Sequence, residues 1–308
     1  WSFFFFFPVG FGGTLLALAN MRRGRTAIGQ HNSGTVDYLG AALLFAITST
    51  LVFIFDRRTQ EAVGDSLRLV LLVTFFLSLA GFLVHESRAK NPFVNLQLFK
   101  IRRFSFSVIS LLIVAMCYSL TGFLLPFYLQ DILHLSPTKV GLLFMAPSML
   151  TAALAPLTGY LAARPGPRIP ATVGVVFMVI SLGIGGLLRV DSHWLLPTLL
   201  VVVGAITNGV FNPANSTAMI AMMPKEHRGF ASAINHVTFG FGSVFGVALG
   251  SLSMSLAFER YTGVPSASLT TANGAGFVAA LNFTFVAAIG LTLVAIMTSA
   301  LRGDGRAR

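Results

Sequence analysis

The chain has 308 residues, of which 55% are hydrophobic and only 10% are charged, and its formal net charge is +11. Soluble domains average roughly 25% charged residues, so this composition excludes an ordinary water-soluble domain. The basic residues lie in short connections and not along a helix with interleaved aromatics, which excludes a nucleic-acid partner. The single cysteine, Cys117, excludes an internal disulfide or a cysteine metal cluster, and the sequence predicts neither a cofactor nor a metal site.

Nine apolar segments fill most of the chain. Each is about long enough to cross the ~30 Å hydrocarbon core of a bilayer as a helix, which satisfies its own backbone hydrogen bonds. We therefore predict an all-α polytopic membrane protein in a lipid bilayer. The predicted spans are 1–19, 38–55, 67–84, 104–130, 140–163, 170–188, 195–220, 231–258 and 276–301.

The connections divide these spans into three groups. Residues 1–19 are expected to be the last helix of an N-terminal bundle, 20–95 two extra central helices, and 96–308 a six-helix bundle with a short tail. The first span begins directly at Trp1, without the basic region of a signal peptide. We therefore expect the chain to be part of a longer polypeptide and to lack the N-terminal half.

Lysine and arginine are distributed unevenly over the connections. Those at 20–37, 85–103, 164–169 and 221–230, together with the C-terminal tail, hold 15 of these residues, and the other connections hold 6. Because cytoplasmic connections carry the excess of Lys and Arg, this bias places the C-terminus in the cytoplasm. The expected location is the plasma membrane, in bacteria the inner membrane.

Three amides follow one face of the seventh predicted span. Asn208, Asn212 and Asn215 recur at helical spacing, and Pro213 among them interrupts the backbone hydrogen bonds. Amides are costly against lipid, so this stripe is expected to face protein or a watery cavity. A solute-binding cavity wall and hydrogen bonds between packed helices are both open as interpretations.

Other polar residues inside the spans give secondary candidates for the cavity. They are Tyr118, Asn235, His236 and Asn282. His236 titrates near neutral pH and is a candidate for binding a proton or a solute, or for a simple hydrogen bond to a neighbouring helix. No Asp or Glu lies deep within a predicted span, so no buried carboxylate is expected to carry a proton.

The eighth predicted span carries Gly242, Gly246 and Gly250, spaced by four residues. Glycines at this spacing let a second helix approach closely, so we predict a packing face.

Several short motifs are spread along the chain. They are Trp1 to Gly10, Asp37-Tyr38-Leu39-Gly40, Asn91 to Phe99, Leu125 to Gln130, Ser136-Pro137 with Gly141, and Gly229 with Ala231, Ser232 and Asn235. Together these motifs resemble the 14-helix drug:proton antiporters of the major facilitator superfamily. The resemblance covers nearly the whole chain, as a partial major facilitator fold of helices six to fourteen. It implies that the carboxylates coupling transport to protons lie in the absent N-terminal half.

The segment Gly159 to Arg168 is similar to the second copy of the superfamily's cytoplasmic loop motif. The resemblance implies that Gly159, Arg164, Gly166 and Arg168 form this loop, with the two arginines as gating or orientation charges. Ala163 occupies a position where the motif often has Asp.

These observations lead to a functional hypothesis with two alternatives. We expect a secondary transporter that exports hydrophobic or cationic small molecules in exchange for protons, and that is not an enzyme. One alternative is a piece without transport activity by itself. The other is a membrane enzyme acting on lipids, although the connections lack the paired acidic motif that such chemistry needs.

Overall fold

The computed structural model describes residue Pro8 and residues 11–14, 37–55, 65–88, 96–163, 166–223, 228–263 and 273–301. The chain divides into two compact units, Trp1–Asp37 and Tyr38–Arg308. The second unit contains every element discussed below. Most of the predicted span 1–19 and the predicted domain boundaries at residues 19 and 95 lie outside the described residues.

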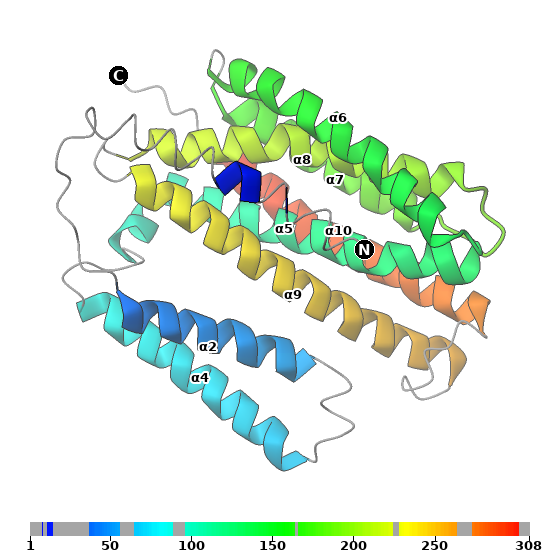
Figure 1. The fold of residues 1–308 in the computed structure, drawn as a ribbon, viewed down its shortest axis with the longest axis horizontal. Coiled ribbons are helices and arrows are strands. Elements are labelled where there is room, and N and C mark those ends of the chain that lie inside the picture. The colour runs from blue at the N-terminus through cyan, green and yellow to red at the C-terminus, as the bar shows by residue number, and fades with distance from the viewer. Residues whose placement is uncertain are drawn as a thin grey trace. The chain divides into compact units, whose positions relative to one another are not determined.

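The described part of the second unit is entirely helical, and Figure 1 shows its long helices side by side. Each of the eight predicted spans from 38–55 to 276–301 coincides with one helix to within a few residues. Among the described residues, seven helices are long and apolar enough to cross a membrane, which confirms the all-α polytopic fold. The helices are α2 (Tyr38–Phe55), α4 (Asp65–Arg88), α5 (Arg102–Phe127), α6 (Pro137–Ala163), α7 (Arg168–Gly185), α8 (Leu195–Ala221), α9 (Arg228–Thr262) and α10 (Gly274–Leu301).

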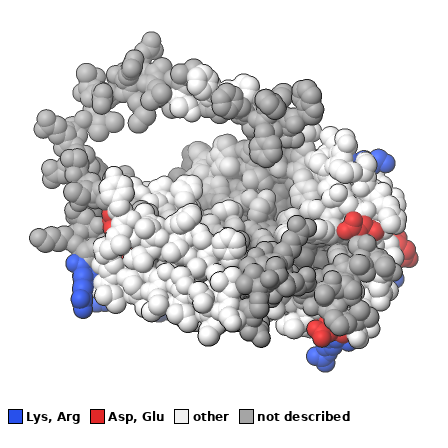
Figure 2. All heavy atoms as spheres, turned by 60° about the horizontal axis from the view of Figure 1, so that its bottom comes forward, with Lys and Arg blue, Asp and Glu red and all other residues white. Residues whose placement is uncertain are grey.

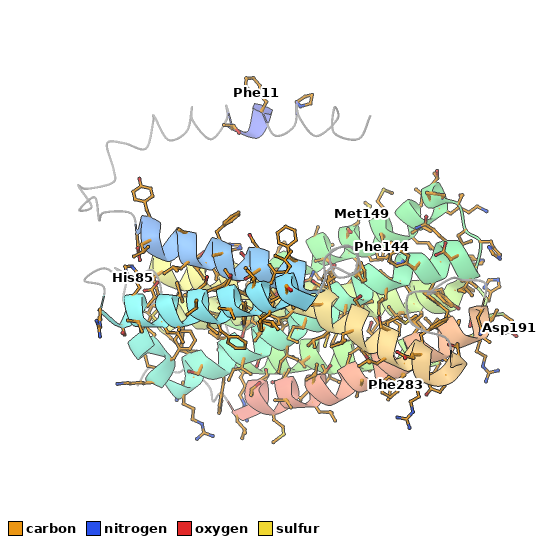
Figure 3. The ribbon with its side chains drawn as sticks, turned by 90° about the horizontal axis from the view of Figure 1, so that it is seen from below. Phe11, His85, Phe144, Met149, Asp191 and Phe283 are labelled. Carbon is orange, nitrogen blue, oxygen red and sulfur yellow. The ribbon has the colours of Figure 1, made fainter. Side chains whose placement is uncertain are left out.

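Charged side chains of the described residues gather toward the ends of these helices, and the described atoms between the ends are uncharged on the face that Figure 2 shows. His85 and Asp191 mark two opposite ends in Figure 3. Large apolar side chains cover the outside of the band, such as Val286, which is 56% exposed, and Met297, which is 61% exposed. An apolar exterior of this kind is the surface that a lipid environment favours.

Six helices from α5 to α10 pack in a pattern with internal two-fold symmetry. Helix α5 packs on α9 as α8 packs on α6, and α10 packs on α5 as α7 packs on α8. Exchanging the first three helices for the last three therefore preserves these pairs, and α7 against α10 maps onto itself, whereas α9 packs on α10 much more extensively than α6 packs on α7. Because successive helices alternate in direction, the two triplets are inverted repeats, an arrangement typical of transporters. Helices α2 and α4 pack on each other, and α2 also contacts α9.

Helix α5 ends in an irregular turn because of Pro126. Proline lacks an amide hydrogen and leaves the carbonyl of Gly122 without its usual partner. The chain continues as a π-helical turn at Tyr128–Ile132, in which the amide of Leu133 donates to the carbonyl of Tyr128 at 3.1 Å. His134, with φ of 52°, then enters the left-handed region and stops the helix.

Helix α9 lies very close to α5 along three glycines. A Cβ atom built on Gly246 would lie 2.7 Å from the Cα of Met116, and one on Gly242 would lie 2.6 Å from the Cβ of Ala115. One on Gly250 would lie 3.0 Å from the Cγ of Leu120. Only residues without a side chain allow the two backbones to approach this closely.

Candidate functional site: a pocket between four helices

A pocket of about 230 Å³ lies between α5, α6, α7 and α8. Small residues create this space where bulkier ones would close it, and Pro147 also interrupts the hydrogen bonds of α6 at the carbonyl of Leu143. The lining residues are Tyr118, Thr121 and Gly122 from α5, Phe144, Pro147 and Ser148 from α6, Met178 and Ser181 from α7, and Leu200, Val201, Gly204 and Ala205 from α8.

The pocket lies deep within the helices. Tyr118 is nine residues before the end of α5 at Phe127, and Gly204 is nine residues after the start of α8 at Leu195. At 1.5 Å per residue this depth is about 14 Å, or roughly half of a ~30 Å hydrocarbon core. Transporters of inverted-repeat architecture bind their solutes at this level.

The polar groups of the pocket are hydroxyls whose protons are mostly engaged. Thr121 donates to the carbonyl of Cys117 at 2.9 Å, Ser148 to that of Phe144 at 2.8 Å, and Ser181 to that of Leu200 at 2.8 Å. The oxygens of Thr121 and Ser148 therefore remain available to accept hydrogen bonds from a solute, whereas Ser181 is only 2% exposed.

Tyr118 differs from the other hydroxyl residues of the pocket. Its side chain is 39% exposed, and its hydroxyl makes no hydrogen bond with another described residue. It can donate to a solute, while its ring and that of Phe144 offer flat apolar surface. None of the lining residues that the structure describes is charged, so the pocket suits hydrophobic solutes and cations with spread-out charge.

Of the seven candidate residues from the sequence, Tyr118 is the one that lines this pocket. The three amides of α8 lie further along the helix than Gly204. Asn212 donates its Nδ2 hydrogen to Oδ1 of Asn208 one turn earlier. Asn215 is fully buried and donates to the carbonyl of Ser107 on α5 at 3.2 Å. In this structure the amides of the stripe therefore bond to each other within α8 and hold α8 against α5.

The other three candidates also lie away from the pocket. The Nδ2 of Asn235 lies 3.6 Å from the thioether of Met219, on which the amide of Asn215 also converges at 3.6 Å. His236 is exposed on α9. Asn282 donates to the carbonyl of Leu188 at 2.9 Å and so holds the connection between α7 and α8.

The loop motif between α6 and α7 is described in part. Gly159 belongs to α6, Arg168 begins α7, and Arg164 lies outside the described residues. Gly166 has φ of 98°, a left-handed conformation in which a residue with a Cβ atom is strained. This backbone conformation explains why residue 166 is a glycine.

One functional group contradicts the sequence reasoning, which expected no buried carboxylate. Glu86 is only 3% exposed in the last turn of α4. The predicted span ended at residue 84, whereas the helix continues to Arg88 and takes Glu86 with it. The pocket hydroxyls of Ser148 and Ser181 were also missed, because single serines in apolar helices give no periodic signal.

Comparisons with known proteins agree with this architecture. The profile of the Major Facilitator Superfamily matches residues 1–247 and also residues 107–304. The riboflavin transporter RibZ of Clostridioides difficile is 29% identical over 247 residues, 77% of this chain and 52% of that protein. A multidrug resistance protein B homolog of Mycobacterium tuberculosis is 28% identical over 292 residues, 92% of this chain and 53% of that protein.

A tetracenomycin C resistance and export protein of Streptomyces glaucescens is 26% identical, covering 82% of this chain and 46% of that protein. The chain spans about half the length of the curated relatives that it matches. Among solved structures, a bacterial homolog of the human lysosomal transporter Spinster has a TM-score of 0.50 at 18% identity, covering 76% of this chain and 57% of that one. That structure supports the fold, and the sequence profile fixes the family: the chain belongs to the Major Facilitator Superfamily.

Proposed function

We propose that the chain forms part of a secondary transporter that exports hydrophobic or cationic small molecules, and that the pocket between α5 and α8 is part of its solute site. The observation that carries this proposal is an uncharged, hydroxyl- and aromatic-lined pocket about halfway along the helices of a major facilitator fold. Membership of a transporter family removes the membrane-enzyme alternative. Export is supported by relatives that are named for multidrug resistance and for tetracenomycin C export.

Alternating access in this architecture requires two bundles that rock about the solute site. We propose that the six-helix bundle of this chain works with an N-terminal bundle of the same transporter. The rival hypothesis is that the chain alone moves no solute. Reconstitution into vesicles with a proton gradient decides this point, since gradient-driven uptake by the chain alone would contradict the need for a second bundle.

The charge of the described helix ends supports a cytoplasmic C-terminus. One end carries Arg88, Lys100, Arg102, Arg103 and Arg168, together with the carboxylate of Glu86. At the opposite end Lys139, Arg189 and Arg260 are balanced by Asp131, Asp191 and Glu259. The positive end then lies on the cytoplasmic side, in bacteria that of the inner membrane. Labelling of a cysteine added after Arg308 in intact and opened cells tests this orientation.

Proton coupling is a further part of the proposal. Among the described residues Glu86 is the one carboxylate that is buried, so it is the acid in this chain to test first. If Glu86 takes part, Glu86→Gln in the whole transporter abolishes gradient-driven export while leaving solute binding intact. Export that remains dependent on the gradient in this variant would assign coupling to other carboxylates.

A binding measurement on the purified chain tests the solute site without requiring transport. Ser148 is exposed to the pocket, so Ser148→Phe fills the space without burying a larger side chain in a packed core. We expect at least tenfold weaker binding of tetraphenylphosphonium, a hydrophobic cation, and of the neutral dye Nile red. Leu157→Phe, on an exposed part of α6 outside the pocket, is the matched control and leaves binding unchanged.

The asparagine stripe of Asn208, Asn212 and Asn215 is the alternative location for the solute site. Asn212→Leu removes its half-buried amide without touching the pocket. A loss of binding in Asn212→Leu with normal binding in Ser148→Phe would move the solute site to the stripe and refute the pocket assignment. Export assays on the whole transporter with the same variants extend the test to transport.

A further inference from the structure

A second depression lies near the end of the molecule at which α6 and α8 begin. Its volume is about 370 Å³, and it is lined by Leu135, Lys139, Leu142, Leu143 and Trp194. It shares no residue with the solute pocket. We call these five residues the Lys139 groove.

The walls of the Lys139 groove are apolar except for one cation. Lys139 is exposed and makes no hydrogen bond or ion pair with another residue that the structure describes. The acidic residues of this end, Asp131, Asp191 and Glu259, are not among the lining residues. An anionic group with apolar attachments is therefore the occupant whose charge and polarity match the groove.

The groove continues as an apolar track toward the middle of the helix. Leu142, Met145 and Met149 follow Lys139 on one face of α6 and are 57%, 54% and 65% exposed. Phe144 and Met149 are labelled on this helix in Figure 3. The ten residue steps from Lys139 to Met149 span about 15 Å, which is half of the ~30 Å hydrocarbon core.

Trp194 closes the other side of the groove at the same level as Lys139. Its side chain is 46% exposed, and its ring lies 5.4 Å from that of His193 between centroids. Tryptophan and lysine near the ends of spanning helices lie at the level of the lipid headgroups. The cation, the indole and the half-bilayer track therefore match the three parts of a lipid molecule.

We propose that the Lys139 groove binds an anionic phospholipid. The lipid phosphate pairs with the ammonium of Lys139, the glycerol region contacts Trp194, and one acyl chain lies along Leu142, Met145 and Met149. A free inorganic anion would leave the apolar walls and the track without a partner, so the occupant is a lipid and not phosphate itself.

Trp194 serves as a fluorescence probe for the test. The chain has two tryptophans, so Trp194 is the single remaining one in the variant Trp1→Phe. The purified chain with Trp1→Phe is reconstituted in vesicles of brominated phosphatidylcholine, whose acyl chains quench tryptophan fluorescence. Unbrominated phosphatidylglycerol, which is anionic, or unbrominated phosphatidylcholine is then added in steps. Recovery of fluorescence measures how well each lipid competes for the surroundings of Trp194.

We expect phosphatidylglycerol to compete about fivefold better than phosphatidylcholine, the factor that corresponds to the ~1 kcal/mol typical of one cation at a membrane surface. Lys139→Gln reduces this preference to about one. Arg260→Gln removes an exposed cation from the same end outside the groove and leaves the preference unchanged.

Equal competition by the two lipids in the unaltered groove would overturn the proposal. A preference that survives Lys139→Gln, or that falls equally in Arg260→Gln, would show a diffuse effect of surface charge and would also overturn it. Displacement by tetraphenylphosphonium in place of the anionic lipid would identify the groove as a solute site. All of these outcomes are independent of transport and of the solute pocket.

Discussion

Replacing Gly246 by alanine tests the close contact between α9 and α5. The added Cβ atom would lie 2.7 Å from the Cα of Met116, whereas two packed carbon atoms lie about 3.5–4.0 Å apart. The helices must therefore separate by about 1 Å. Because the obstacle is a backbone atom and not the tip of a flexible side chain, the cost falls toward the upper part of the ~1–3 kcal/mol typical of overpacking.

A second effect acts in the opposite direction. Alanine stabilises a helix interior by about 1 kcal/mol relative to glycine. The net loss in the free energy of unfolding for Gly246→Ala is then about 1–2 kcal/mol, which lowers the melting temperature by about 2–8 °C. Gly240→Ala on the same helix is the control, because no atom lies within 4 Å of its added Cβ atom. Its melting temperature should equal that of the unaltered chain or exceed it slightly.

The chain supplies a probe for this measurement. Cys117 is its single cysteine and is only 1% exposed, so a coumarin maleimide reacts with it when the helices come apart on heating. Circular dichroism recorded in parallel separates global unfolding from a local opening beside Met116. Equal melting temperatures for Gly246→Ala and Gly240→Ala would refute the inference that close backbone contact holds α9 against α5.

Two further predictions concern hydrogen bonds between helices and connections. Asn215→Ala removes the amide that donates to the carbonyl of Ser107, and it should lower the free energy of unfolding by about 0.6–1.7 kcal/mol in the same maleimide assay; an unchanged melting temperature would contradict a packing role. Tyr128→Phe removes the hydroxyl that donates to the carbonyl of Arg189 at 2.6 Å, and it should raise amide hydrogen exchange in the 186–194 connection by severalfold. Exchange that rises equally in distant helices would show general destabilisation and not the loss of this bond.

The helices could be predicted because the apolar length that lets a helix cross a bilayer depends only on the residues of that helix. A bilayer demands about 20 apolar residues per crossing, and charge at each helix end marks where the crossing stops. The glycine spacing of α9 belongs to the same class, since Gly242 and Gly246 are four residues apart on one helix. Their individual neighbours on α5 could not be predicted, because the spacing does not say which helix packs against it.

The solute pocket depends on four helices at once and has no signature in any of them. Ser148 and Ser181 are ordinary serines in apolar segments until α6, α7 and α8 bring them to one space. The asparagine stripe gave a stronger sequence signal, because amides are costly against lipid. In the structure that cost is met by hydrogen bonds such as those from Asn212 to Asn208 and from Asn215 to Ser107.

Glu86 shows the limit of reasoning from one helix at a time. Glu86 lies two residues beyond the predicted span, which ended at residue 84, so no buried carboxylate was expected there. Burial instead depends on the elements that surround the last turn of α4, which hydropathy alone does not register.

The absence of ionised side chains among the described residues of the pocket also determines what the bundle keeps out. A compact inorganic ion such as sodium would have to give up its water shell there and would gain only a few hydroxyl oxygens in return, at a cost of many kcal/mol. Bulky solutes that hold water weakly lose much less on entering. The proposed solute site is therefore selective for hydrophobic molecules over the small inorganic ions whose gradients a cell must preserve.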